Sequence, residues 1–163
     1  MPEEFVEYVR GRAPRLRQRA YLMCRDRSFA HDLTQDTLAK LYVSWERAVQ
    51  AENLDAYVSR IMLRTFLDHK RSRAAREVAV AEIFPHEEHR DAAPETRLAL
   101  LEALRRLPPR DRAIVVLRYW EDHSVESVAA MLGVSPSMVK TRSMRALARL
   151  RQVLGAEAAA LAA

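Results

Sequence analysis

Apolar residues recur at helical spacing along most of this chain, in blocks divided by prolines, glycines and capping residues. In the first half this spacing predicts four helices that pack as a bundle. The inward positions of the first helix are Phe5, Val6 and Val9, and those of the second, which Pro14 opens, are Leu16, Ala20 and Met23. In the third helix, between about residues 30 and 49, they are Leu33, Thr37, Leu38, Leu41 and Trp45. In the fourth, which Asn53 caps, they are Leu54, Tyr57, Val58, Ile61, Met62 and Thr65.

The second half predicts two further helices, Arg97–Leu107 and Arg110–Trp120, which Pro108–Pro109 divides because proline interrupts the helical hydrogen bonds. The stretch Ser124–Arg151 then has two helical blocks. Their inward positions are Val125, Val128, Ala129 and Leu132, then Val134, Val139, Met144, Leu147 and Leu150.

Capping residues divide these last two blocks. Ser124 is expected to cap the first, and Ser135 the second, where Pro136 suits the first turn. Gly133 ends the first block, since a residue without a Cβ adopts the left-handed conformation cheaply. The pattern is that of a helix-turn-helix with Pro136–Arg151 as the recognition helix. A plain helical hairpin with a solvated basic face is the alternative.

The outward face of the expected recognition helix carries hydrogen-bond donors suited to phosphates and base edges. They are Ser137, Lys140, Thr141, Arg142 and Arg145.

Composition favours an all-helical protein, because only three of 163 residues are glycine, too few for the tight turns of an all-β fold. Charge then divides the chain: residues 1–76 hold 15 basic and 10 acidic side chains, residues 77–95 hold 1 and 6, and residues 96–163 hold 11 and 6. We expect two basic helical domains, here called the first module (1–76) and the second module (96–154). An acidic linker (77–95) joins them, and a disordered tail (155–163) follows.

No catalytic or cofactor-binding pattern is present, so an enzyme is not expected. The segment His86–His89 has its histidines three apart rather than four, inside the acidic linker, and is interpreted as a solvated charge run. Cys24 lies in an apolar run and is expected to be a buried thiol. Neither a signal peptide nor an apolar run long enough to span a membrane is found, which predicts a cytoplasmic protein.

Three ordered motifs carry a resemblance to a known family. They are AHDLTQDTLAKLYVSW (30–45), LDAYVSRIMLRTFLDHKR (54–71) and LRRLPPRDRAIVVLRYWEDHSVESVAAMLGVSPSMVKTRSMRALARLR (104–151). With them the chain resembles bacterial RNA polymerase sigma factors of the extracytoplasmic-function (ECF) group, of the short actinobacterial SigE type. The resemblance implies a sigma-2 domain in the first module and a sigma-4 domain in the second.

The resemblance also implies roles for particular residues. The segment that docks on the β′ clamp helices of core RNA polymerase matches Asp32, Gln35 and Asp36, with Leu38 and Leu41 as an apolar seam. Candidates for contacts at the −10 promoter element are Arg60, Arg64, Lys70 and Arg71, and the loop at 48–53 lies where the family captures a flipped base. At the −35 element, Lys140, Arg142 and Arg145 are the main candidates and Ser137 and Thr141 lesser ones. The other face of sigma-4 would engage the β-flap, and an anti-sigma factor is a possible further partner.

Two alternatives from other classes stay open on the sequence alone. One is a single-module helix-turn-helix regulator whose N-terminal bundle senses a signal or dimerises. The other is an interaction protein that binds polymerase without touching DNA. No cofactor is expected under any of these readings.

Overall fold

The computed structural model describes the backbone of residues 1–80 and 95–162, and the side chains of residues 1–69 and 98–155. These residues form α-helices and one π-helix, without a strand among them, which confirms the expected all-helical fold. In chain order the elements are α1 (Glu3–Cys24), α2 (Arg27–Val43), α3 (Trp45–Gln50), α4 (Leu54–Val80), α5 (Glu95–Arg105), α6 (Pro109–Val115), the π-helix η1 (Val116–Trp120), α7 (Val125–Leu132) and α8 (Pro136–Ala162).

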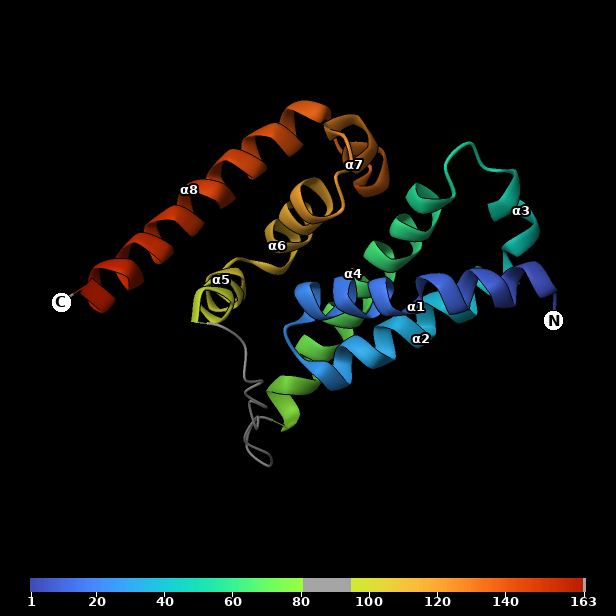
Figure 1. Cartoon of the computed structure of the whole chain (residues 1–163), viewed down its shortest axis with the longest axis horizontal. Coiled ribbons are helices and arrows are strands. Elements are labelled where there is room, and N and C mark those ends of the chain that lie inside the picture. Colours follow the sequence, from blue (N-terminus) through green and yellow to red (C-terminus); the bar gives the residue numbers. More distant parts are fainter. Residues whose placement is uncertain (81–94, 163) are drawn as a thin grey trace.

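The first module consists of α1 to α4, with α1, α2 and α4 packed on one another and α3 joining α2 to α4 (Figure 1). Its largest fully buried side chain is Phe66, which the periodicity did not single out and which packs against Phe29 with 6.3 Å between ring centroids. Trp45 is also buried, edge-on to Phe5 and beside Tyr8. Trp45 is therefore a core residue and not a platform for stacking bases.

The expected break at Pro14 is wrong, because α1 continues through it as one helix of 22 residues. An interior proline loses one backbone hydrogen bond and costs about 3 kcal/mol or more. Here the apolar stripe of Phe5, Leu16, Ala20 and Met23 keeps its helical period across the proline and stays buried. Packing of this stripe offsets the local cost.

A break occurs instead at Ser44, where one helix was expected to run to about residue 49. The hydroxyl of Ser44 donates to the carbonyl of Lys40 at 3.0 Å. Serine side chains that bond to the preceding turn compete with the helical backbone. The chain therefore turns at Ser44 and α3 begins with Trp45. The cap of α4 is confirmed, since Asn53 Oδ1 accepts from the backbone N–H of Ala56 at 3.0 Å.

The second module confirms the helix-turn-helix, formed by α7 and α8. Ser124 accepts from the N–H of Ser127 at 3.0 Å, and Ser135 accepts from the N–H of Met138 at 3.2 Å. Gly133 ends α7 with φ of 69°, the left-handed conformation that its missing Cβ permits.

Three boundaries differ from the sequence expectation. The expected helix Arg110–Trp120 is α6 followed by η1, in which the N–H of Glu121 bonds to the carbonyl five residues earlier, on Val116, at 3.0 Å. Helix α4 runs to Val80, so the first residues assigned to the linker are helical. Helix α8 runs to Ala162 instead of ending near a disordered tail. The rest of the linker, with His86–His89, lies outside the described residues.

The two modules pack against each other. Figure 1 shows α6 and α7 facing α1 and α4, with α8 on the far side of α6 and α7. The buried apolar side chains of both modules form one cluster. In this structure the protein is one closed body.

Candidate nucleic-acid and polymerase interfaces

The recognition helix α8 presents most of its predicted DNA-binding side chains to solvent. Ser137, Lys140, Thr141 and Arg145 are exposed, while Val139 and Ala146 on the opposite side are buried. The Thr141 hydroxyl donates to the carbonyl of Ser137 at 3.0 Å, so it is engaged within the helix. The ammonium of Lys140 and the guanidinium of Arg145 are the groups on this face best suited to phosphates or guanine edges.

Arg142 differs from its neighbours, because its Nη1 lies 3.0 Å from Asp111 Oδ1 on α6. The Asp111 side chain is one-fifth exposed and the Arg142 side chain about a third. The contact holds the guanidinium against the second module. Arg142 can therefore reach DNA only with the donors that Asp111 leaves unused, or after this ion pair breaks.

Met144 is a residue that sequence reasoning placed wrongly. It was expected in the apolar stripe, but its side chain is 72% exposed, and Ser143 takes the buried position beside it. Met144 follows Lys140 by four residues and therefore lies on the same outward face. A long apolar side chain there suits the C5-methyl group of thymine. Met144 stands among polar residues at helical spacing, and this pattern in the sequence could have shown that its side chain faces outward.

Helix α4 presents Arg60 and Arg64 to solvent at i, i+4 spacing, so the two guanidinium groups share one side of the helix. Val58, Met62 and Phe66 on its other side are buried. The arginines are therefore mounted on a helix whose position the core determines. Lys70 and Arg71 lie farther along α4, where the structure describes the backbone only.

The predicted polymerase-binding residues of α2 do not all share one surface. Asp32 and Gln35 are exposed, and Leu38 is half-buried. Asp36 pairs with His69 on α4, with Oδ2 and Nε2 2.7 Å apart. Leu41 is completely buried, so the expected apolar seam is wrong at this position. One helical turn separates Leu38 from Leu41, and helical spacing alone does not show which of the two faces out.

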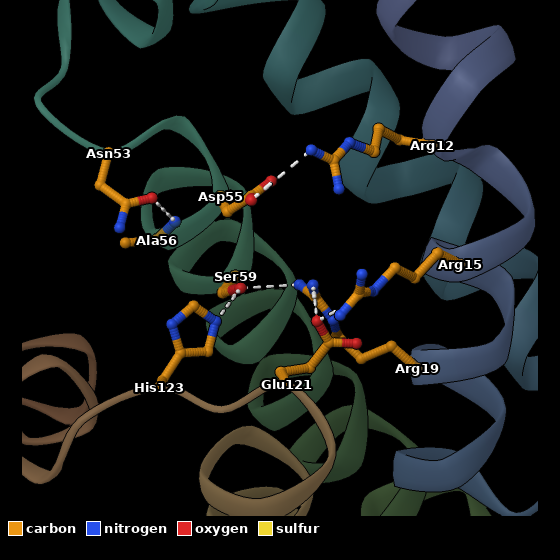
Figure 2. A network of polar contacts seen from close by, with 9 residues as sticks. All are labelled: Arg12, Arg15, Arg19, Asn53, Asp55, Ala56, Ser59, Glu121 and His123. Atoms are coloured by element: carbon orange, nitrogen blue, oxygen red, sulfur yellow. Dashed lines mark hydrogen bonds and ion pairs between the residues drawn. The ribbon is translucent and has the colours of Figure 1, made fainter.

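A polar network that the sequence did not indicate lies between the modules (Figure 2). Arg19 on α1 donates from Nη1 to the hydroxyl of Ser59 on α4 at 2.7 Å, and from Nη2 to Glu121 Oε2 at 2.6 Å. Arg15 Nε lies 3.5 Å from the same oxygen. The Ser59 hydroxyl is 2.9 Å from His123 Nε2. Glu121 and His123 both belong to the connection between η1 and α7.

The backbone of this connection directs both side chains toward the first module. The wide π-helical turn of η1 precedes it, and Asp122 has φ of 58°, a left-handed conformation that aspartate tolerates better than most residues. Burial lowers the pKa of His123, with the cation of Arg19 acting in the same direction and Glu121 opposing it. The imidazole is therefore held in its neutral form more strongly than an exposed histidine.

Neither a membrane-spanning helix nor a metal-binding cluster is found in the described ranges. None of their helices combines the length and apolar character needed to cross a bilayer. Within the same residues, three or more His, Cys, Asp or Glu side chains never gather in a way that could hold a metal ion.

Both modules match known protein families. Residues 8–76 match the family model described as Sigma-70 region 2, and residues 97–150 match Sigma-70, region 4. The RNA polymerase sigma-E factor of Streptomyces coelicolor is 40% identical over 153 residues, which cover 93% of this chain and 86% of that protein. The ECF RNA polymerase sigma factor SigM of Mycobacterium tuberculosis is 34% identical and covers 93% of this chain and 77% of its own length.

A solved structure shares the arrangement of both modules. It is the sigma factor RpoE in complex with the anti-sigma factor NepR from Bartonella quintana, with a TM-score of 0.82 and 25% identity over 94% of this chain and 98% of that chain. Sequence, motifs and fold thus agree, and this chain belongs to the sigma-70 family as an ECF RNA polymerase sigma factor with regions 2 and 4.

Proposed function

We propose that this sigma factor reads the −35 element as duplex DNA through α8 and the −10 element as separated strands through α4. The observation that supports this division is the exposed pair of basic side chains on each helix: Lys140 and Arg145 on α8, Arg60 and Arg64 on α4. A recognition helix enters the major groove and contacts base edges with its N-terminal residues. Two arginines four residues apart on a helix can bind successive phosphates along the backbone of one separated DNA strand.

The first and second modules act as a sigma-2 and a sigma-4 domain, and the segment between them acts as a connector. The protein binds core RNA polymerase and promoter DNA, and it supplies no turnover chemistry and needs no cofactor. It acts in the cytoplasm, where the polymerase is. Strand opening is driven by binding, since extruding a base costs a few kcal/mol that a pocket and stacking can offset.

Runoff transcription tests this function directly. Purified core polymerase, incubated with the protein and with promoters recovered by sequencing transcripts after its expression, is expected to start at defined positions only when the protein is present. A one-module regulator would bind duplex DNA in the same assay and yet support no initiation. That result would exclude the proposed function.

Docking on the β′ clamp helices is assigned to the outer face of α2. Asp32 and Gln35 supply exposed polar groups, and the half-buried Leu38 supplies an apolar edge. Asp36 contributes as the partner of His69, through which α2 is tied to α4. Leu41 acts only indirectly, as part of the core beneath this surface. The face of the second module away from DNA engages the β-flap.

An anti-sigma factor is a further partner that we assign to this protein. The similar solved structure of RpoE is that of a sigma factor in complex with an anti-sigma factor, NepR. The exposed polar face of α2 is suited to such a protein, because covering it would exclude polymerase.

Replacing Arg60 and Arg64 together with alanine is expected to weaken promoter binding by the holoenzyme without changing sequence preference. Each lost phosphate contact lowers the slope of log affinity against log salt by about 0.7–0.9, so the pair lowers it by about 1.5. The measurement is a salt titration of open-complex formation. Arg10→Ala with Arg17→Ala, two exposed positions on α1, is the charge-matched control and should leave the slope unchanged. If the slope decreased equally in the Arg60 and Arg64 variant and in the Arg10 and Arg17 control, the phosphate contacts assigned to Arg60 and Arg64 would be wrong.

A further inference from the structure

One cationic side chain of the recognition helix α8 is paired with a carboxylate, and its neighbours on the outward face are not. Arg142 Nη1 lies 3.0 Å from Asp111 Oδ1 on α6, whereas Lys140 and Arg145 have no ion pair within the described residues. Asp111 and Arg142 are 31 positions apart along the chain, and the packing of α6 on α8 brings them together. Arg142 is therefore held by the fold, and the other two cations are not.

Arg142 lies at the edge of the outward face and not at its centre. Thr141 and Met144 are exposed on that face, while Val139 and Ala146 are buried on the opposite side. At about 3.6 residues per turn, Arg142 comes between the two sides, and its side chain is 37% exposed. A helix that lies in the major groove has base edges in front of it and a phosphate backbone on either flank. In that placement Arg142 faces a phosphate and not a base.

Asp111 has the surroundings of a fixed anchor. It belongs to the first turn of α6, where the helix dipole favours an acidic side chain. Ala113 and Ile114 of the same helix are completely buried, so the core of the second module determines where the carboxylate stands. The Asp111 side chain is only 20% exposed, and within the described residues Arg142 is its one ion-pair partner.

The contact with Asp111 leaves most of the Arg142 guanidinium available. It uses a single terminal nitrogen, Nη1, of a planar group that carries several N–H donors. A phosphate accepts parallel hydrogen bonds from such a group, provided that the plane of the guanidinium is correctly oriented. A carboxylate bound to Nη1 restricts this orientation before DNA arrives. The conformational entropy that Arg142 loses on binding a phosphate is therefore smaller than for an unrestrained arginine.

The pair also shortens the range over which the charge of Arg142 acts. With the Asp111 carboxylate 3.0 Å away, the two opposite charges nearly cancel at a distance. The unpaired charges of Lys140 and Arg145 attract any phosphate within the screening length, which is about 8 Å at physiological salt. A paired guanidinium attracts a phosphate mainly in direct contact, where its remaining N–H groups meet the phosphate oxygens. Arg142 therefore favours one position of α8 on the DNA, which an unpaired arginine would not do.

We propose that Asp111 is a positioning residue for promoter recognition: it holds Arg142 so that the guanidinium binds one DNA phosphate beside the −35 bases and fixes the register of α8 in the major groove. Phosphate contacts fix the register of a protein on DNA, and base contacts then read the sequence. Lys140 and Arg145 meet their bases in the register that this contact sets. The proposal rests on the proposed function, since it requires α8 to read the −35 element.

The first test compares the affinity of the holoenzyme for the cognate promoter with its affinity for a promoter altered at −35. In Asp111→Ala, Arg142 is released and contacts phosphates in any register. We therefore expect tighter binding to the altered promoter and weaker binding to the cognate one, so that the ratio of the two affinities falls about tenfold. Asp111→Asn keeps the size of the side chain and should lower the ratio in the same direction. An unchanged ratio in both variants would overturn the proposal.

A salt titration separates positioning from a plain effect of charge. On the altered promoter, the slope of log affinity against log salt should become steeper by about 0.9 in Asp111→Ala, because the released arginine displaces one more counterion. On the cognate promoter, where Arg142 already binds a phosphate in wild type, the slope should stay the same. Equal steepening on both promoters would show that Asp111 merely repels DNA, and the positioning role would be wrong.

A double-mutant cycle tests whether Asp111 acts through Arg142. Arg142→Ala alone should lower the affinity ratio by about tenfold, since the fixed phosphate contact is lost. Adding Asp111→Ala to Arg142→Ala should then change the ratio by less than about twofold, because the side chain that Asp111 positions is gone. If the second substitution still lowered the ratio tenfold, Asp111 would act on its own. That result would reject the positioning role, and so would an Arg142→Ala protein with the wild-type ratio.

The matched control is Glu126→Ala. Glu126 is exposed in the first turn of α7 and has no ion pair within the described residues, so this variant loses the same charge at an equivalent place in a neighbouring helix. It should change both affinities alike and keep their ratio. Thermal unfolding distinguishes positioning from loss of fold. Because a partly exposed pair adds little stability, each variant should unfold within about 3 °C of wild type.

The same experiment separates a failure of this proposal from a failure of the proposed function. If the wild-type holoenzyme shows no preference between the two promoters, α8 does not read the −35 element and the proposed function has failed. If wild type shows the preference and both Asp111 variants keep it, the proposed function stands and the positioning role of Asp111 is wrong.

Discussion

Replacing Lys140 and Arg145 together with alanine is expected to abolish promoter-specific initiation. Both side chains are exposed on the outward face of α8, and no ion pair with another residue holds either of them within the described residues. A lost base contact costs about 1–3 kcal/mol, and the two positions are far enough apart in the helix for the losses to add approximately. We expect an affinity for the −35 element lower by about thirtyfold or more.

The measurement compares holoenzyme affinity for the cognate promoter with that for a promoter altered at −35. The variant is expected to lose the difference between them, because base contacts carry specificity and phosphate contacts do not. Arg149→Ala with Arg151→Ala removes the same charge farther along α8, at exposed positions. That control should weaken both promoters modestly and keep the preference. Unchanged preference in the Lys140 and Arg145 variant would exclude α8 as the −35 reader.

Phe66→Ala is expected to destabilise the first module by about 3–5 kcal/mol, since truncating a fully buried aromatic residue leaves a cavity. Phe66 is 0% exposed and lies one turn from Met62 on the inner side of α4. Its loss loosens the helix that carries Arg60 and Arg64. Urea unfolding followed by circular dichroism measures the change, and initiation should fall with it.

Two variants make this prediction specific. Phe66→Leu keeps most of the apolar volume and should cost less than about 1.5 kcal/mol. Tyr42→Ala truncates an aromatic residue that is 43% exposed, and it should cost less than Phe66→Ala although its ring lies 5.2 Å from that of Phe5. If Tyr42→Ala and Phe66→Ala lowered the free energy of unfolding by similar amounts, the buried side chains of α4 would not be what holds this helix in place.

Local signals in the sequence predicted the second module well. Ser124, Gly133, Ser135 and Pro136 act within a few residues of their own position, through caps and a left-handed turn, so their structural roles can be inferred without the fold. The cap at Asn53 follows the same reasoning. The motifs of both modules also identified the family, which the relatives and the solved structure confirm.

Positions that depend on neighbouring helices were predicted less well. Pro14 was expected to divide a helix, but burial of the stripe around it offsets the local cost. Leu41 and Met144 were placed on the wrong sides of their helices. An apolar residue at helical spacing can face either way, and only the packing partner determines which. Arg142 was expected on the outward face, but it pairs with Asp111, and that pair depends on how α6 crosses α8.

The recognition helix is the part that the sequence by itself determined: its start, its cap and its outward donors are all encoded within residues 124–145. The relation between the two modules was decided only by tertiary structure. Arg19 and Glu121 are separated by 102 positions along the chain, and no periodicity or spacing connects them. Their contact exists because a π-helical turn and a left-handed Asp122 direct Glu121 toward α1. Long-range electrostatic pairing of this kind depends on three-dimensional distance, which a linear pattern does not contain.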